Sequence, residues 1–508
     1  MSSANDALTD SALPAEAGTG AAQWRFARAS RAHVVIDAAD YFLLMQQAML
    51  RARQRIMLIG WDFDTRVRLG PGRRWWNRPS RRRYPARLGA FVIWLANRTR
   101  GLEVRVLKWN FGALKFLFRG SMILDLLRWF WHPAIDFKFD SAHPLGCSHH
   151  QKIVVIDDRF AVCGGIDMTG DRWDTPEHRE HDPRRQGPGH RPYGPWHDIT
   201  MMIEGEAAAA LGELGRARWR RAGGAELRPC ADQGESAWPT GLTAEFTDVE
   251  IGIARTSARW GRYPEVREIE ALFVQHIARA RRFIYAESQY FASRRVAEAL
   301  AARLSAPEPP EVILINPESA HGWLEQAAMD GARVRLLHAI AEHDPLRRLR
   351  VFVPYSGRKP IYVHAKLMIV DDEILRVGSA NLNNRSMGLD SEADMFIDAA
   401  RPANDRPEVR AAITRLRHRL LAEHCGLEPA ALPALLEDAG SMAAMIDARP
   451  RSARRLQAFD LRPLTDAEKA IADSALLDPE RPEELFEPIS RGRVRGLFRR
   501  GGLLHRPR

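Results

Sequence analysis

The chain carries the stretch HAKLMIVD at residues 364–371, and an earlier stretch, HQKIVVID at residues 150–157, has the same form. Both follow the spacing H-x-K-x4-D. Each stretch ends in a short apolar run rich in β-branched residues, which predicts a buried strand. Alternate residues of a strand share a face, so the histidine and the lysine, two positions apart, should point to the same side. The chain therefore presents the same pair of imidazole and ammonium groups twice.

This pair of side chains suits attack on phosphorus. A neutral imidazole is a good nucleophile, and a protonated imidazole is a good acid near neutral pH. A lysine ammonium supplies positive charge where phosphate oxygens accumulate negative charge. One copy would give half of such a site, and two copies facing each other would give both halves.

The alternative interpretation is that two core histidines happen to precede buried strands. The residues that follow the two stretches favour the catalytic interpretation because they also match. Gly165 and Ser379 follow their histidines at the same offset, and Asp167 and Asn381 come two residues later. The duplication therefore extends beyond the eight-residue pattern.

The repeat organises much of the chain. A helix-then-strand pattern at residues 37–59 recurs at 268–284. The separation between the two copies is far longer than the roughly 20–50 residues of a solenoid repeat, so it indicates duplicated domains. Alternating strands and helices favour α/β layers. We expect four parts, namely a disordered leader (1–24), a first half (25–235), a second half (245–440) and a helical, basic C-terminal tail (441–508).

Several further motifs occur in matching order. The first half contains HHQK (149–152), GGID (164–167), RWDTP (172–176) and PWHD (195–198). The second half contains ESQYF (287–291), YVHAK (362–366), GSAN (378–381), and RSM to DSE (385–392). With these motifs, from about Ala39 to Ile397, the chain resembles the phospholipase D superfamily, and specifically the eukaryotic-type catalytic core with two H-x-K-x4-D motifs. The resemblance implies duplicated phospholipase D-like α/β/α sandwich domains that form a pseudo-dimer, with the active site between them.

The resemblance also implies roles for individual residues. His150 would attack the phosphodiester to form a phosphohistidine, and His364 would protonate the leaving alcohol and later activate the acceptor. Lys152 and Lys366 would bind the non-bridging oxygens. One sequence alone does not show which histidine is the nucleophile, and the choice of His150 follows the resemblance.

The remaining expected site residues support this core. Asn381 and Ser379 are expected to bind phosphate, while Asp198 and Glu392 match the acids that orient the histidines in this family. Asp157 and Asp371 complete the two motifs and are grouped with the catalytic set, although we expect them to anchor local backbone. No metal and no cofactor is expected, because the lysines supply the positive charge.

Composition sets broad limits. Hydrophobic residues make up 45% of the 508 residues, which indicates a globular protein. The formal net charge of +11 favours anionic partners, either phospholipid or nucleic acid. The four cysteines have no paired or metal-ligand spacing. We find no signal-peptide pattern and no run of about 20 apolar residues, so localisation is left open, with a cytoplasmic or peripheral-membrane protein expected.

The function that these observations predict is a phospholipase D that converts glycerophospholipids to phosphatidic acid and headgroup alcohol, with some transphosphatidylation. The expected partners are phospholipid at a membrane surface and a water or alcohol acceptor, with no nucleic acid, and the expected state is a monomer. A cardiolipin-synthase-like phosphatidyltransferase, a superfamily nuclease and a non-catalytic binding protein are the alternatives. Complete His and Lys residues in both copies argue against the last of these.

Two aromatic segments stand out, at residues 61–76 and 111–131. Both mix tryptophan and phenylalanine with cationic residues. Such a mixture is typical of a segment that lies at a membrane interface, but an ordinary amphipathic core helix would show it too. The sequence does not decide between these two interpretations.

Overall fold

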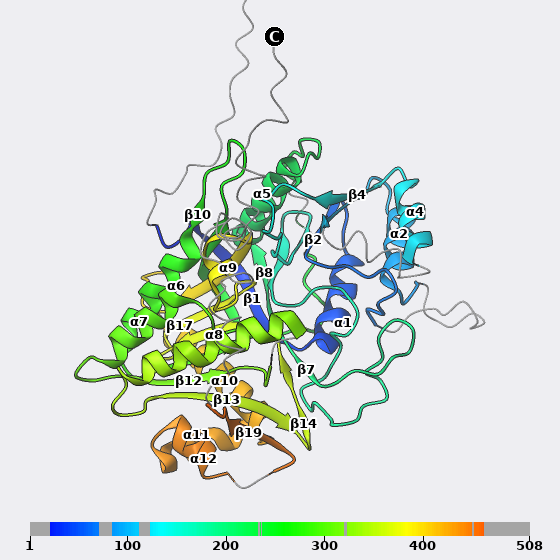
Figure 1. Ribbon diagram of the computed structural model, residues 1–508. Helices are drawn as coiled ribbons and strands as arrows, with labels where there is room; N and C mark the ends of the chain where they lie inside the picture. The colour runs from blue at the N-terminus through cyan, green and yellow to red at the C-terminus, as the bar shows by residue number, and fades with distance from the viewer. Residues whose placement is uncertain are drawn as a thin grey trace, which may run out of the picture.

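The computed structural model describes residues 21–70, 84–110, 122–231, 234, 236–319, 323–449 and 452–461. Figure 1 shows the elements of the first half, in blue through cyan to bluish green and green at α5, beside those of the second half, in green to orange. The first half comprises β1 (Arg25–Ile36), α1 (Ala38–Met49), β2 (Arg55–Gly60), α2 (Leu88–Arg98), β3 (Glu103–Trp109), α4 (Met122–Phe130), β4 (Ile135–Asp140), β5 (Ile153–Ile156), β6 (Phe160–Gly164), β7 (Trp196–His197), β8 (Ile199–Gly205) and α5 (Glu206–Arg221).

The second half repeats this order. It comprises β9 (Phe246–Ser257), β10 (Val266–Arg267), α6 (Glu268–Arg279), β11 (Phe283–Ser288), α7 (Arg294–Leu304), β12 (Glu311–Ile315), α8 (Trp323–Ala341), β13 (Leu349–Ser356), β14 (Lys359–Pro360), β15 (Tyr362–Val363), β16 (Lys366–Val370), β17 (Ile374–Gly378), α9 (Asn384–Gly388), β18 (Glu392–Asp398) and α10 (Pro407–Cys425). Then follow α11 (Leu432–Ala439), α12 (Met442–Asp447) and β19 (Arg454–Ala458).

Strand pairing demonstrates the duplication. The strand order is β4-β3-β2-β5-β6-β8-β1 in the first half and β13-β12-β11-β16-β17-β18-β9 in the second. In each half the first three strands are parallel and the others are antiparallel. Strands β1 and β9 pair antiparallel with each other, so they join the two halves into one large sheet.

Alternation along the strands places helices on both faces of the sheet. In β2, Ile56 and Leu58 pack into the core beneath α1, α2 and α4, whereas Met57 and Ile59 face a core that α5 and α10 cover. The latter core contains strand residues from both halves, and helices α6 to α8 cover the other face of the second half. The predicted fold class, duplicated α/β domains with helices on both sheet faces, is confirmed.

The two motif aspartates lie at the far end of the motif strands from the lysines. Asp157 accepts hydrogen bonds from the backbone N–H groups of Arg53, Gln54 and Arg55, at 2.7–2.8 Å. Asp371 accepts from three consecutive backbone N–H groups in the same way, those of residues 281–283, at 2.7–2.8 Å. These contacts correct their grouping with the catalytic residues, because each carboxylate anchors the start of a neighbouring strand.

We expect Asp157→Ala and Asp371→Ala each to destabilise the protein by about 2–4 kcal/mol, because three consecutive backbone donors lose a charged acceptor. The measurement is the shift of the urea unfolding midpoint. Asp405→Ala is the control, since Asp405 forms an exposed ion pair with Arg410 and should cost less than about 1 kcal/mol. Equal shifts in all three variants would contradict the anchoring role.

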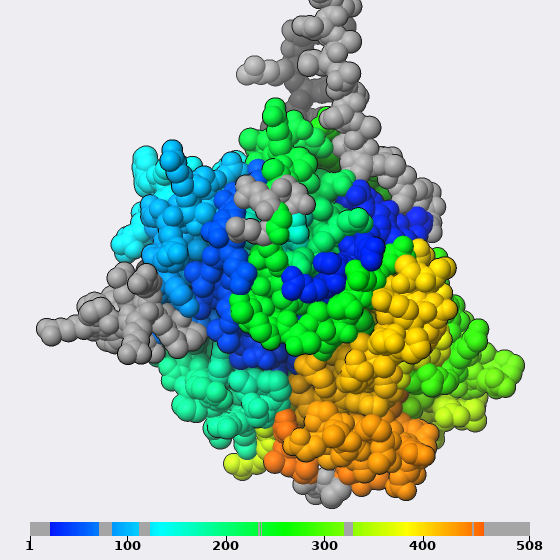
Figure 2. All heavy atoms as spheres, turned by 180° about the vertical axis from the view of Figure 1, so that it is seen from behind, coloured from blue at the N-terminus to red at the C-terminus, as the bar shows by residue number. Residues whose placement is uncertain are grey.

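Both ends of the described chain contribute to the fold in ways that the sequence did not predict. Ala22 is buried and the backbone N–H of Trp24 donates to Ile253 O at 2.7 Å, although both residues fall in the predicted disordered leader. Strand β19, within the predicted C-terminal tail, pairs antiparallel with β13. Figure 2 shows the orange C-terminal elements packed against the second half. Residues 1–20 and 462–508 lie outside the described residues.

The second aromatic segment is partly described. Residues 111–121, like Trp75 and Trp76 of the first segment, lie outside the described residues. Helix α4 buries Met122 and Trp129 but leaves Leu124, Leu127, Phe130 and Trp131 exposed, and Trp131 is 78% exposed. The helix thus combines a core face with an exposed apolar face. Among the described residues, no helix is both long enough and apolar enough to span a bilayer.

Candidate active site

Each motif histidine is bound by a carboxylate from the opposite half. The His150 Nδ1 atom lies 3.0 Å from both carboxylate oxygens of Glu392, the first residue of β18. The His364 Nδ1 atom lies 2.7 Å from Asp198 Oδ2, between β7 and β8. A carboxylate on Nδ1 fixes the ring orientation and leaves Nε2 for the other partner of the imidazole. The two expected orienting acids therefore cross between the halves.

Backbone contacts hold this crossed arrangement. Strands β7 and β15 pair in parallel across the halves, and the His364 N–H donates to His197 O at 2.7 Å. On the other side the His150 N–H donates to Ser391 O at 3.0 Å. Each histidine thus lies beside the backbone of the residue that precedes its own carboxylate partner.

Both lysines lie buried beside their histidines. Lys152 Nζ donates to His150 O at 3.0 Å and lies 3.5 Å from Asp167 Oδ2. Lys366 Nζ donates to His364 O and, at 3.3 Å, to Gln289 Oε1. Burial is the main cause that lowers the pKa of Lys366, to about 7.

The electrostatics show that the four motif side chains converge. Burial first, and then the ammonium groups of both Lys152 and Lys366, lower the pKa of His150 and of His364 well below the usual histidine value. Each lysine therefore acts on both imidazoles. Burial and the neighbouring cations therefore favour the neutral form of both imidazoles.

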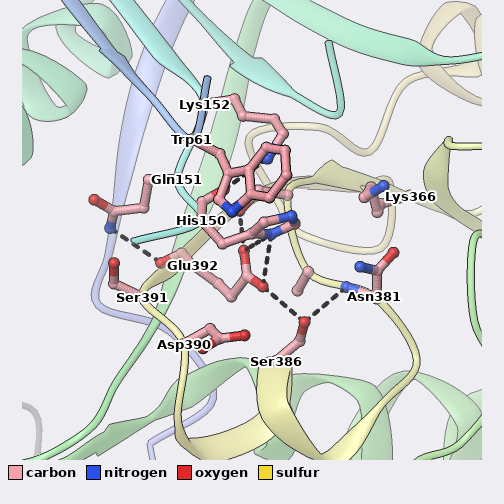
Figure 3. Close-up of polar contacts among 12 residues, drawn as sticks. Trp61, His150, Gln151, Lys152, Lys366, Asn381, Ser386, Asp390, Ser391 and Glu392 are labelled. Atoms are coloured by element: carbon pink, nitrogen blue, oxygen red, sulfur yellow. Dashed lines mark hydrogen bonds and ion pairs between the residues drawn. The ribbon is translucent and has the colours of Figure 1, made fainter. Parts of the chain in front are cut away.

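Glu392 lies in a cradle of hydroxyl groups. Ser386 Oγ donates to Glu392 Oε1 at 2.7 Å (Figure 3), and Ser379 Oγ donates to Oε2 at 2.5 Å. Burial raises the pKa of Glu392 to about 8, while Lys152 and the two hydroxyl donors oppose this rise. Burial likewise raises the pKa of Asp198 to about 7, opposed by Lys366.

The cradle changes the role expected for Ser379. Its hydroxyl donates to Glu392 and accepts the Ala393 N–H at 3.1 Å, so it supports the orienting acid and not a phosphate oxygen. Asn381 differs: among the described residues, its buried Oδ1 atom has no hydrogen-bond partner, and its backbone N–H donates to Ser386 Oγ at 3.1 Å. Ser386 was missed as a site residue; its place in the RSM-to-DSE motif was the only signal.

Aromatic rings flank both imidazoles. The Trp61 ring meets His150 edge-on, with centroids 6.4 Å apart, and the Trp196 ring lies 5.3 Å from that of His364. The Arg172 guanidinium lies 4.1 Å from the Trp196 ring centroid and lowers the pKa of His364 further. Trp196 and Arg172 belong to the PWHD and RWDTP motifs, but no role at the site was predicted for them.

Two polar residues of the quoted motifs, His149 and Gln289, have different surroundings. His149 is fully buried and its Nδ1 lies 2.8 Å from Ser391 Oγ, so it packs between the halves. Gln289 Nε2 donates to the hydroxyls of Tyr290, at 2.8 Å, and Tyr362, at 3.0 Å, while its Oε1 accepts from Lys366. Gln289 therefore connects a motif lysine to two phenols.

Comparison with known proteins adds independent information. A family model described as Phospholipase D matches residues 343–472, which continues past Ile397, where the sequence resemblance ends. Phospholipase D alpha 1 of Nicotiana tabacum is 27% identical over 397 residues, covering 55% of this chain and 49% of that protein. Phospholipase D alpha 1 of Arabidopsis thaliana is 26% identical with the same coverage. The chain thus spans about half the length of these curated relatives.

Solved structures were compared as well. A phosphatidylserine synthase of Haemophilus influenzae Rd KW20 aligns over 82% of this chain and 95% of its own, with 12% identity and a TM-score of 0.48. The phospholipase D family member Nuc of Salmonella typhimurium aligns over 34% of this chain and 91% of its own, with 15% identity and a TM-score of 0.23. The family assignment depends on the matched family model and the plant relatives, and the duplicated H-x-K-x4-D site agrees with it. The family model and the plant relatives together support the phospholipase D superfamily as the family of this chain.

Proposed function

We propose that the protein is a phospholipase D that hydrolyses glycerophospholipids to phosphatidic acid and a headgroup alcohol, and that it transfers the phosphatidyl group when an alcohol replaces water. The observation that carries this proposal is the crossed pair of carboxylate-bound histidines, with both lysines acting on both rings. This arrangement offers one nucleophile and one proton carrier to a single phosphate group.

In the first step, His150 Nε2 attacks phosphorus and the bond to the headgroup oxygen breaks. His364 gives its Nε2 proton to that oxygen, so the headgroup leaves as a neutral alcohol. The His150 ring becomes cationic when its nitrogen is phosphorylated, and the carboxylate of Glu392, at 3.0 Å from Nδ1, stabilises this charge. The bound phosphodiester anion offsets the lysine ammoniums, which favours the protonated His364 that this step needs.

In the second step, the now neutral His364 accepts a proton from water or an alcohol, whose oxygen attacks phosphorus. The bond between phosphorus and His150 Nε2 breaks, and both histidines return to their starting states. Lys152 and Lys366 bind the non-bridging oxygens in both steps, and the side-chain N–H group of Asn381 is the proposed additional donor.

Surface properties support a phospholipid substrate. The exposed apolar face of α4 and the net charge of +11 suit a surface of anionic and zwitterionic lipid. Because one chain supplies both halves of the site, a single chain suffices for the proposed reaction.

The test is to incubate purified protein with vesicles of mixed headgroups plus a short primary alcohol and to identify the lipid products by mass spectrometry. We expect phosphatidic acid together with the phosphatidyl alcohol, and loss of both products in His150→Ala and in His364→Ala. Asp405→Ala is the control that keeps both products. Cleavage of nucleic acid without lipid turnover would exclude the proposal, and transfer only to a second lipid's hydroxyl would show a phosphatidyltransferase instead.

A further inference from the structure

We propose that Asp37, His178, His197 and Glu423 form a structural binding site for one divalent transition-metal ion of the zinc type, behind the reaction site. All four side chains are buried, three of them completely. One ligand atom from each residue lies within 4.8 Å of the others. Two imidazole nitrogens and two carboxylate oxygens are a donor set that Zn²⁺ accepts in four-coordinate sites. We call these four residues the buried tetrad.

Donor separations in the buried tetrad are close to those of a tetrahedral site. His178 Nε2 lies 3.1 Å from Glu423 Oε1 and 3.4 Å from Asp37 Oδ2. His197 Nδ1 lies 2.9 Å from Glu423 Oε1 and 3.1 Å from Asp37 Oδ1. A tetrahedron with metal–ligand bonds of about 2.0–2.1 Å has edges of about 3.3–3.4 Å. Small outward shifts of the donors would therefore make room for the ion.

Both histidines of the buried tetrad have a carboxylate on the nitrogen that faces away from it. His178 Nδ1 lies 2.9 Å from Asp174 Oδ2, and His197 Nε2 lies 2.7 Å from Glu287 Oε2. A metal-binding histidine almost always donates its other N–H group to such an acceptor, which fixes the tautomer and increases the basicity of the ligating nitrogen. The outer carboxylates leave the inward nitrogens as the metal ligands.

A second, independent observation points to a ligand. Asp37 Oδ2 is completely buried and accepts no hydrogen bond from the residues that the structure describes. A buried carboxylate oxygen is costly unless a hydrogen bond or a cation compensates it, and Oδ2 has the His178 Nε2 atom as an ion-pair partner at the long distance of 3.4 Å. Asp37 and His178 also have φ values of 64° and 40°, which non-glycine residues rarely adopt. The fold thus holds unfavourable backbone conformations at two of the four proposed ligands.

The buried tetrad contains residues of both halves, which indicates a structural role for the ion. Asp37, His178 and His197 belong to the first half, whereas Glu423 lies on α10 of the second half. Asp37 also contacts Asp198, the partner of His364: the Asp37 N–H donates to Asp198 O at 2.8 Å, and the Asp198 N–H donates to the Asp37 carboxylate Oδ1 at 3.3 Å. A bound ion would therefore fasten the two halves together directly behind one of the crossed carboxylates.

The first experiment uses the full chain without a metal-binding tag. We expect inductively coupled plasma mass spectrometry to find about one zinc per chain, and X-ray absorption to show a four-coordinate shell of nitrogen and oxygen without sulfur. Removal of the ion with a strong chelator should lower Tm, and added Zn²⁺ should restore it. Added Co²⁺ should give the visible absorption bands of a tetrahedral site.

Substitutions locate the ion. His178→Gln and Glu423→Gln should reduce the bound metal at least tenfold. Glu287→Gln, which removes the outer carboxylate of His197 and also alters its contacts with Tyr285 and His424, should weaken zinc affinity about 10–100-fold. Asp372→Asn is the matched control because it breaks a buried ion pair between Asp372 and Arg417 of α10 outside the tetrad, and it should retain the metal. If a tetrad variant does not fold, the chelation and reconstitution of the unaltered chain decide. An unaltered chain that takes up no stoichiometric dication, with a Tm that the chelator does not change, would overturn the proposal.

Discussion

His364→Asn should accumulate a covalent phosphatidyl adduct on His150 when the substrate has a p-nitrophenyl leaving group. Such a leaving group departs without a proton, so the first step does not need His364. The second step does need a base to deprotonate water, and we expect it to slow by about 10²–10⁴-fold. The measurements are a burst of p-nitrophenol and intact mass spectrometry after a basic quench, with peptide mapping to locate the adduct.

The same variant provides an internal comparison. With a choline headgroup, whose leaving oxygen requires a proton, His364→Asn should form almost no adduct. His150→Asn should form none with either substrate. An adduct mapped to residue 364 in the His150→Asn protein would reverse the roles of the two histidines, while leaving the reaction class intact.

Glu392→Gln and Asp198→Asn should each lower kcat by about 10²–10⁴-fold with little change in KM. Each amide has nearly the shape of the carboxylate that it replaces but cannot stabilise a cationic ring, and it can hold the imidazole in the wrong tautomer. For Glu392 the affected state is the phosphorylated His150, because their atoms lie 3.0 Å apart. For Asp198 it is the protonated His364, at 2.7 Å. Steady-state kinetics on vesicles check both predictions.

Asp398→Asn is the matched control for this pair. Asp398 ends the same strand β18 that begins with Glu392, and it forms an ion pair with Arg279 at the opposite end of the strand. Loss of this ion pair should lower the free energy of unfolding without a change in kcat. A comparable fall in kcat for Asp398→Asn would mean that the strand as a whole, and not the carboxylate of Glu392, determines the rate.

The duplicated fold could be predicted because it repeats local signals. Residues 37–59 and 268–284 share a helix-then-strand pattern, and the structure forms α1 with β2 and α6 with β11 over these ranges. Pairing between the halves could not be predicted. The contact of β1 with β9 and the added strand β19 depend on which sheet edges meet in space. The residues of a short strand do not determine its partner strand.

The candidate active site was likewise predictable only in part. His150, Lys152, His364 and Lys366 were predicted from spacing, and the structure brings them together. The crossed assignment of Glu392 to His150 was not visible, because the two residues lie in different halves. Ser379 was assigned to phosphate because its position matches Gly165, but spacing does not show that its hydroxyl is already used by Glu392. The buried tetrad escaped notice because its members are scattered from residue 37 to residue 423.

The crossing of the carboxylates has a consequence for how this protein would lose activity. Neither motif histidine has its carboxylate partner in its own half, so a small slip at the seam would separate both pairs while each half remained folded. Heat or denaturant should therefore abolish turnover before the circular dichroism signal falls. By the same logic, two separately expressed fragments would be inert alone and active only after they reassociate.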